Sequence, residues 1–319
     1  MLDQTVHIPP VDKALSRLGL GCFVLRTDQW DEQTGADLTA AMAAAFRAGI
    51  NHFDTAASYG WGYSEYLLGQ FIADKREQVF TASKVAIDEM DAQAMLEQVN
   101  QSLERMQAEM IDLYYIHWPR QGKDMRPLME GLEMARQQGK LGAIGVSNFS
   151  VEQMAQVAEV GQINAHQLGY HLFWRFAERD VIPYCREHGI AFITYGSIAH
   201  GILTGKFPRQ LQFESNDQRN NIVLFEDEVW PHIYAGVEEL KKLAQAANRP
   251  LAHLAIRWVL HQEGVHSAMV GARNPQQVEQ NVQALEGDIA PDIFARMTQI
   301  SDEVMKHVPD VGNVYRYYP

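Results

Sequence analysis

The chain has 319 residues, of which 46% are hydrophobic and 21% are charged, so it can bury a large core and is neither disordered nor fibrous. Its 40 acidic and 27 basic residues give a net charge of −13, which repels nucleic-acid phosphates and anionic lipid heads, so we expect no nucleic-acid or membrane partner. Two cysteines and no basic-then-apolar leader predict a cytoplasmic protein without disulfides.

Short apolar runs alternate with longer amphipathic segments along most of the chain. The runs predict eight β-strands, at residues 17–22, 50–54, 78–82, 111–117, 141–146, 163–166, 190–195 and 265–270. Helical periodicity lies between them, as in residues 91–106 behind an expected Asp91 cap, and Ser150 with Gln153 predicts a capping box. Glycines that suit a left-handed helix end precede five of these strands, at Gly49, Gly139, Gly161, Gly189 and Gly264.

This alternation is typical of parallel strands joined by crossover helices. Eight units of about 40 residues account for the length, so we predict an α/β fold, one (β/α)8 TIM barrel domain over residues 1–319. A doubly wound open sheet is the alternative, but residues 19–24 lack the third glycine of a dinucleotide fingerprint. A long polar loop, residues 196–231, follows the seventh strand and is interpreted as a cofactor clamp or a variable surface insertion.

Polar side chains stand at the ends of three successive predicted strands. Asp54 ends the second strand and Tyr59 follows it, Lys84 follows the third, and His117 ends the fourth. Catalytic groups of a TIM barrel lie at the carboxyl ends of its strands. The sequence therefore predicts that these four side chains meet at the mouth of the barrel.

The sequence resembles the aldo-keto reductase family over roughly residues 18–285. The matching positions are residues 50–60, 64–65 and 68–69, Lys84 and His117. The resemblance, which extends to bacterial NADP-dependent members and the branch similar to potassium-channel beta subunits, implies reduction of an aldehyde, ketone or aldose. Three alternatives remain open: a cofactor-binding regulatory or scaffold protein with negligible turnover, an aldose dehydrogenase running in the oxidative direction, and an unrelated barrel hydrolase or isomerase.

The four residue types suit carbonyl reduction, because the alkoxide left after hydride transfer must be protonated. A tyrosine has an ordinary pKa near 10, and a lysine cation held beside it by a carboxylate would lower that pKa. We therefore predict Tyr59 as general acid/base, Lys84 and Asp54 as the pair that tunes its pKa, and His117 as the polar partner of the carbonyl oxygen.

Further residues at the mouth are expected to hold the cofactor. Ser147, Asn148 and Gln167 offer hydroxyl and amide groups to a nicotinamide carboxamide, and the Tyr195 ring could stack on the nicotinamide. For Asn148, helix capping is the alternative role. The resemblance implies a pyrophosphate loop that includes Gly196, Ser197, Ile198, Gly201, Leu203 and Lys206. In that loop, Gly196 and Ser197 replace the serine and proline that are usual in the family.

The resemblance also implies an adenosine-phosphate site at Gly271, Ala272, Arg273, Gln277, Gln280 and Asn281. Arg273, next to the N-terminus of a predicted helix, offers a cation to a 2′-phosphate, which favours NADP(H) as the cofactor. Gln277 and Gln280 stand where arginine and glutamate are frequent in the family, which leaves NAD(H) open as a second cofactor.

Four aromatic residues on loops or strand ends are predicted to line a pocket for a small-molecule carbonyl compound: Phe23, Trp30, Trp61 and Trp118. Packing of the barrel loops is their alternative role. The tail, residues 311–318, is expected either to fold over the site or to dock as an ordinary terminus. No histidine pair has a carboxylate at ligand spacing, so we predict no metal site. The oligomeric state is not predicted.

Overall fold

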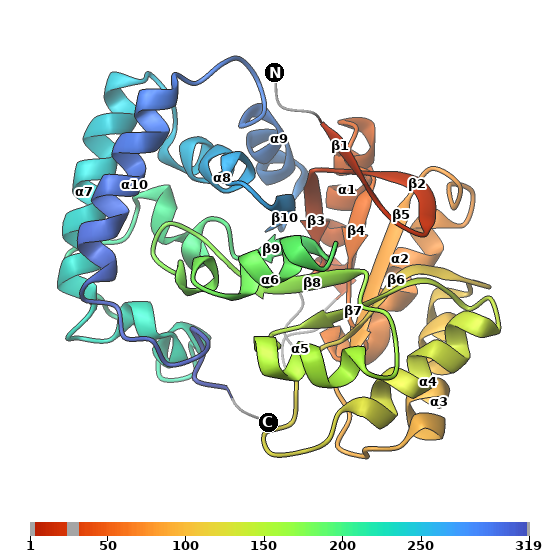
Figure 1. Ribbon diagram of the computed structural model, residues 1–319. Coiled ribbons are helices and arrows are strands. Elements are labelled where there is room, and N and C mark those ends of the chain that lie inside the picture. Colours follow the sequence, from red (N-terminus) through yellow and green to blue (C-terminus); the bar gives the residue numbers. More distant parts are fainter. Residues whose placement is uncertain (1–3, 24–31, 318–319) are drawn as a thin grey trace.

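The computed structural model describes residues 4–23 and 32–317, and at its centre eight parallel strands form a closed barrel (Figure 1). In the barrel the strands follow the order β10-β3-β4-β5-β6-β7-β8-β9. Their bounds are β3 (Leu18–Gly21), β4 (His52–Asp54), β5 (Phe80–Val85), β6 (Ile111–Ile116), β7 (Leu141–Ser147), β8 (Ala165–Gly169), β9 (Ala191–Tyr195) and β10 (Val265–Gly271). The predicted fold class and strands are confirmed, with strand ends that differ by a few residues.

One helix of the outer layer follows each barrel strand. These are α1 (Glu32–Arg47), α2 (Tyr63–Ile72), α3 (Ala92–Met106), α4 (Arg126–Gln137), α5 (Val151–Ala158), α6 (Val181–Glu187), α8 (Leu251–His261) and α9 (Pro275–Gln283). Two further helices, α7 (Trp230–Ala246) and α10 (Pro291–Met305), pack against each other at one side of the barrel (Figure 1).

The local signals at the helix ends are largely confirmed. The Asp91 carboxylate accepts the Ala94 amide at 2.9 Å, and Ser150 forms the predicted capping box with Gln153. Left-handed φ angles of 65° to 88° are found at Gly49, Gly139, Gly189 and Gly264. Gly161 lacks a positive φ, so that expectation is wrong; an added Cβ there would stand 2.5 Å from Met129 Cγ, so the Met129 side chain would have to move to admit a larger residue.

A two-stranded antiparallel hairpin, β1 (Thr5–Ile8) and β2 (Val11–Ser16), precedes the barrel and was not predicted. Ile8 and Leu15 are fully buried in the apolar cluster inside the barrel, so the hairpin closes its amino-terminal end. Lys13 Nζ pairs with the buried Asp112 carboxylate at 2.8 Å, which ties the hairpin to β6. Because one end of the barrel is closed in this way, the mouth at the other end is left for function.

The long loop after β9 is confirmed, and short 3-10 helices give it order: η3 (Ala199–Thr204), η4 (Gln218–Asn221) and η5 (Val223–Phe225). The Phe225 ring lies 5.4 Å from Phe207 and 5.1 Å from Phe213, between ring centroids. The Arg219 guanidinium stacks over Phe213 at 4.4 Å. This loop therefore has an aromatic core of its own.

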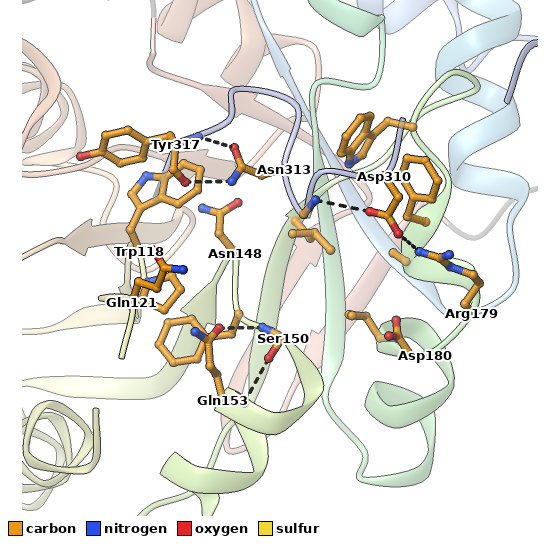
Figure 2. A pocket seen from close by; sticks show the side chains of 18 residues that line it. Trp118, Gln121, Asn148, Ser150, Gln153, Arg179, Asp180, Asp310, Asn313 and Tyr317 are labelled. Carbon is orange, nitrogen blue, oxygen red and sulfur yellow. Dashed lines mark hydrogen bonds and ion pairs between the residues drawn. The ribbon is translucent and has the colours of Figure 1, made fainter. Parts of the chain in front are cut away.

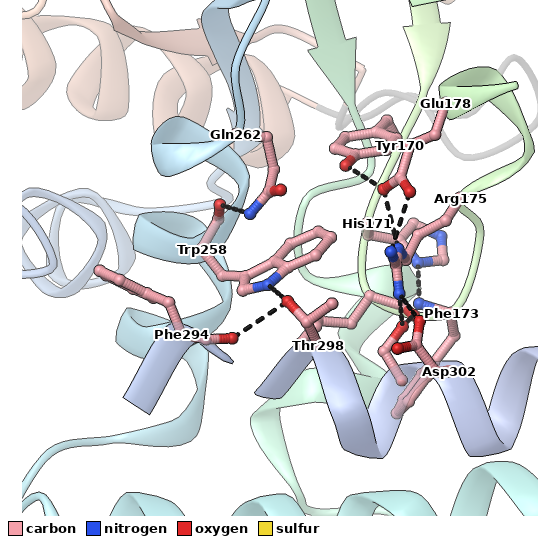
Figure 3. A network of polar contacts seen from close by, with 12 residues as sticks. Tyr170, His171, Phe173, Arg175, Glu178, Trp258, Gln262, Phe294, Thr298 and Asp302 are labelled. Carbon is pink, nitrogen blue, oxygen red and sulfur yellow. Dashed lines mark hydrogen bonds and ion pairs between the residues drawn. The ribbon is translucent and has the colours of Figure 1, made fainter. Parts of the chain in front are cut away.

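A polar network joins α10 to the barrel (Figure 3). Arg175, in the segment between β8 and α6, donates to both Glu178 carboxylate oxygens at 2.8 Å and to Asp302 on α10 at 2.5 Å. Nearby, the Trp258 indole of α8 donates to Thr298 of α10 at 2.9 Å. These bonds fix α10, and with it the start of the tail that follows, against the carboxyl end of β8.

We expect Arg175→Ala to lower the free energy of unfolding by about 2–3 kcal/mol, because two carboxylates lose their charged donor. Lys306→Ala is the matched control, since its pair with Glu303 is exposed and contributes less than about 0.5 kcal/mol. Urea unfolding followed by circular dichroism measures both. Equal losses for the two variants would contradict an anchoring role for Arg175.

Candidate active site

A buried ion pair lies at the carboxyl ends of β4 and β5. Lys84 Nζ contacts Asp54 Oδ1 and also donates to the Thr55 carbonyl at 2.9 Å. The second Asp54 oxygen accepts Gln167 Nε2 from β8 at 2.9 Å. The side chains of Lys84 and Asp54 are only 2% and 6% exposed, so each charge depends on the other and on these hydrogen bonds.

Tyr59 lies beside this pair, on the 3-10 turn η1 (Tyr59–Gly62) that follows β4. Lys84 Nζ is 5.1 Å from the centroid of the Tyr59 ring, and the His117 ring meets that ring edge-on at 5.9 Å. The structure thus brings the four predicted catalytic residues together at the mouth.

The direction of the Tyr59 pKa differs from the expectation. Burial, followed by the negative charge of Asp54, raises the Tyr59 pKa well above its ordinary value. The net lowering that we expected beside Lys84 is therefore not found, because burial and the Asp54 charge both act in the opposite direction. The phenol keeps its proton at neutral pH.

His117 is neutral in this site. Burial, and then the positive charge of Lys84, lowers the His117 pKa well below its ordinary value. Asn148 Nδ2 donates to the His117 backbone carbonyl at 3.1 Å, which links the ends of β6 and β7. A neutral imidazole in this position can donate a hydrogen bond to a substrate oxygen.

The residues predicted for the nicotinamide form a connected set. The Tyr195 hydroxyl donates to Asn148 Oδ1 at 2.7 Å, Asn148 Nδ2 donates to Ser147 Oγ at 3.1 Å, and Ser147 Oγ donates to the Gln167 carbonyl at 3.0 Å. Asn148 has a left-handed φ of 64°, and the N-cap of α5 is Ser150 instead. The alternative that Asn148 caps the helix is therefore wrong.

The predicted pyrophosphate loop is a tight turn at the end of β9. Gly196 and Gly201 have positive φ angles of 72° and 91°. The amides of Gly201 and Leu203 donate to the Ile198 carbonyl at 3.0 and 3.2 Å, so in this conformation the turn itself uses them. The Ser197 hydroxyl is buried and has no partner in the described part of the chain. Lys206 is exposed.

The predicted adenosine-phosphate segment begins where β10 ends, at Gly271. Gln277 Oε1 accepts a hydrogen bond from the Arg273 backbone amide at 2.9 Å. The oxygen of this side chain therefore stabilises the turn between β10 and α9. Asn281 Nδ2 approaches the Gly271 carbonyl at 3.5 Å. Arg273 and Gln280 are exposed, and Ala272 is buried.

The predicted substrate aromatics lie in different places. Phe23 is 57% exposed and meets Tyr59 edge-on at 4.9 Å, and the Trp118 ring lies 6.2 Å from His117, so both border the mouth. Trp61 is 81% exposed and stands at the surface. Trp30 lies outside the described residues.

Of the two alternatives for the tail, folding over the mouth is the one found. This holds for residues 311–317, because the described chain ends at Tyr317. The Tyr315 ring lies 6.3 Å from Trp118, 5.3 Å from His200 and 6.5 Å from Tyr195, nearly parallel to the last. No single residue of the tail was predicted to take part in the site. The aromatic residues clustered in the tail are the feature that could have pointed to a role in the site. The local sequence, however, does not indicate where these rings dock.

Contacts with the loop after β9 hold the tail in this position. Arg316 donates to both Glu226 carboxylate oxygens at 3.0 Å, and the Val223 amide donates to the Val314 carbonyl at 3.0 Å. The tail and the loop after β9 therefore form one wall of the mouth.

Within residues 4–23 and 32–317, no three or more histidine, cysteine, aspartate or glutamate residues are grouped so that they could bind a metal ion. In the same part of the chain, every helix is too short or too polar to span a bilayer.

Comparisons with known proteins agree with this geometry. Residues 17–302 match the model of the Aldo/keto reductase family. The chain is 38% identical to the aldo-keto reductase YhdN of Bacillus subtilis, over 83% of each protein. It is 29% identical to an NADH-specific methylglyoxal reductase of Escherichia coli, over 88% of this chain and 93% of that protein.

Solved structures give the same result. The glycerol dehydrogenase AKR11B4 of Gluconobacter oxydans is 32% identical and superposes with a TM-score of 0.87, over 97% of this chain and 98% of that one. An aldo/keto reductase of Klebsiella pneumoniae in complex with NADP and acetate is 25% identical, with a TM-score of 0.76 over 98% and 99%. The chain therefore belongs to the aldo/keto reductase family of oxidoreductases, which use NAD(P)H and typically act on small carbonyl compounds.

Proposed function

We propose that this enzyme reduces the carbonyl of an aldehyde, ketone or aldose to the alcohol, with Tyr59 as the proton donor. The observation that carries the proposal is the convergence of Tyr59, His117 and the buried Lys84–Asp54 pair at the carboxyl ends of the barrel strands. A bound nicotinamide cofactor would supply the hydride.

Each of the four side chains has a distinct role in this proposal. Neutral His117 donates a hydrogen bond that orients the carbonyl oxygen. Tyr59 gives its phenolic proton to that oxygen as negative charge develops on it. Lys84 stabilises the tyrosinate that remains, and Asp54 keeps Lys84 charged and in position.

The protonation state of Tyr59 supports reduction over oxidation near neutral pH. Reduction needs the phenol as an acid, and the raised pKa keeps it protonated. Oxidation of an alcohol needs the tyrosinate as a base, which becomes abundant only as the pH approaches the raised pKa.

The residues at the mouth fit a phosphorylated dinucleotide. Ser147, Asn148, Gln167 and Tyr195 would hold the nicotinamide, and the buried, unpartnered Ser197 hydroxyl is available to the phosphates. We propose NADP(H) over NAD(H), because Arg273 offers an exposed guanidinium beside the start of α9. The remaining loop and α9 positions predicted from the sequence complete the proposed cofactor site.

Tyr59→Phe is expected to lower kcat by about 10²- to 10⁴-fold, because it removes the proton donor and leaves the ring in place. Steady-state reduction of a panel of aldehydes, ketones and aldoses measures the loss, and fluorescence titration should show NADPH affinity within about twofold of wild type. Tyr66→Phe, at a partly exposed tyrosine, is the control. A wild type that binds NADPH but reduces no compound would favour the regulatory alternative.

Lys84→Met is expected to lower the free energy of unfolding by about 3–5 kcal/mol, because it leaves the Asp54 carboxylate buried and unpaired. The double variant Lys84→Met/Asp54→Asn should recover part of that stability while remaining inactive. Urea unfolding measures stability, and Lys242→Met, at an exposed pair, is the control. If the second substitution recovers no stability, the unpaired carboxylate is not the cause of the loss.

Arg273→Ala is expected to raise the KM for NADPH by about tenfold and to leave the KM for NADH within about twofold, because only NADPH carries the 2′-phosphate. Initial rates with each cofactor at saturating aldehyde measure the effect. Arg296→Ala, at an exposed arginine of α10, should change neither value. An equal increase for both cofactors would contradict recognition of the 2′-phosphate.

A further inference from the structure

A cavity of about 340 Å³ adjoins the mouth on the side of the tail (Figure 2). Its walls come from the segments after β6, β7 and β8 and from tail residues 310–317. Tyr59, Lys84 and Asp54 do not line it. Its volume lies in the range of about 300–1,000 Å³ in which small-molecule sites are found. We call it the distal cavity.

The distal cavity shares two residues with the catalytic mouth, Trp118 and Asn148. The Trp118 ring lies 6.2 Å from the His117 ring on one side and 5.0 Å from Tyr317 on the other. Asn148 bonds the His117 carbonyl and the Tyr195 hydroxyl. A substrate whose carbonyl lies at His117 can therefore extend past this shared edge into the cavity.

Aromatic rings and side-chain amides line the distal cavity together. Trp118, Phe176 and Tyr317 are all at least partly exposed. The Gln121 amide has no hydrogen-bond partner among the described residues, and Gln153 uses its oxygen to accept the Ser150 amide, which leaves its NH₂ group for a ligand. Rings that cover C–H faces, beside amides that bond hydroxyl groups, suit a sugar ring.

The charges that line the cavity favour an uncharged ligand. Arg179 is the one cation among its described lining residues, and it is paired with Asp310 of the tail. Asp180 is the remaining charged residue, and its carboxylate accepts the Val181 amide at the start of α6. A phosphorylated ligand would meet more negative than positive charge here and would have to break the ion pair.

We propose that the distal cavity binds an uncharged, polyhydroxylated portion of an extended substrate whose carbonyl is reduced at Tyr59. This inference rests on the proposed function for the reacting end of the substrate. The Arg175 network and the Arg179–Asp310 pair hold the two walls in place, so the cavity is formed before the substrate binds.

The test compares benzaldehyde with 4-formylphenyl β-D-glucopyranoside, which adds a glucosyl group through a para oxygen; that oxygen by itself makes the carbonyl less reactive toward hydride. The wild type should show a kcat/KM about tenfold higher for the glucoside. Gln121→Ala, which removes a free amide, and Ala177→Phe, which fills the cavity, should abolish most of this preference and leave benzaldehyde kinetics within about twofold. Gln137→Ala, on the exposed surface of α4, is the matched control and should keep it.

A phosphorylated ligand tests the charge argument. The 6-phosphate of the same glucoside should lose the preference over benzaldehyde in the wild type. A phosphate that is preferred over the neutral glucoside would overturn the proposal of an uncharged ligand.

A ligand without a carbonyl separates this proposal from the proposed function. Phenyl β-D-glucopyranoside should give a saturation-transfer NMR signal with wild type and a much weaker one with Ala177→Phe. That result supports the distal cavity even if neither aldehyde is reduced, in which case the proposed function fails alone. Equal kcat/KM for the two aldehydes, with equal NMR signals for wild type and variant, would overturn the cavity proposal and leave the function standing.

Discussion

The Lys84–Asp54 pair is the interaction on which the arrangement of the mouth depends. Two buried charges are costly to remove from water, so their position is stable only where hydrogen bonds complete their coordination. Thr55 supplies a carbonyl to Lys84, and Gln167 supplies an amide to Asp54. Gln167 lies on β8, four places from β4 in the strand order, and reaches Asp54 only because the sheet closes into a barrel.

The same pair explains the protonation of its neighbours. Burial is the largest cause of the shift in the pKa of Tyr59 and in that of His117, and the nearer charge of the pair adds to it: Asp54 raises the first pKa further and Lys84 lowers the second further. Burial disfavours the charged form of each group, which leaves a protonated phenol and a neutral imidazole side by side. An acid and a hydrogen-bond donor therefore face the mouth together, as reduction of a carbonyl requires.

The sequence predicted the strand–helix units, which repeat along the chain, and the residues that stand at a fixed place in each unit. Alternating apolar runs indicated the barrel, and polar residues at strand ends indicated Asp54, Lys84 and His117. The hairpin before the barrel was missed because Ile8 and Leu15 reveal their role only when they enter the barrel. The Tyr59 pKa direction was wrong because burial and pairing are properties of the folded chain.

The tail shows why the remaining part of the site could not be predicted. Arg316 bonds Glu226, which is 90 residues away, and Tyr315 packs against rings from β9, from the segment after β6 and from the turn after β9. Hydrophobic periodicity in the sequence cannot predict such contacts, because each of them depends on where α10 ends in the folded chain. The position of the tail follows from the Arg175 network, which anchors α10, together with the contacts between the tail and the loop after β9.

The proposed chemistry and the proposed recognition thus rest on different parts of one barrel. The proposed proton donor and the ion pair are fixed by β4, β5 and the buried hydrogen bond from β8, where a change of one residue disturbs a buried charge. The distal cavity is lined mostly by segments that leave the barrel and by the tail, where Gln121 is exposed and carries no buried partner. Loop substitutions there can change which substrate fits without altering the stability of the pair, so substrate choice in this fold is free to vary while the reaction is retained.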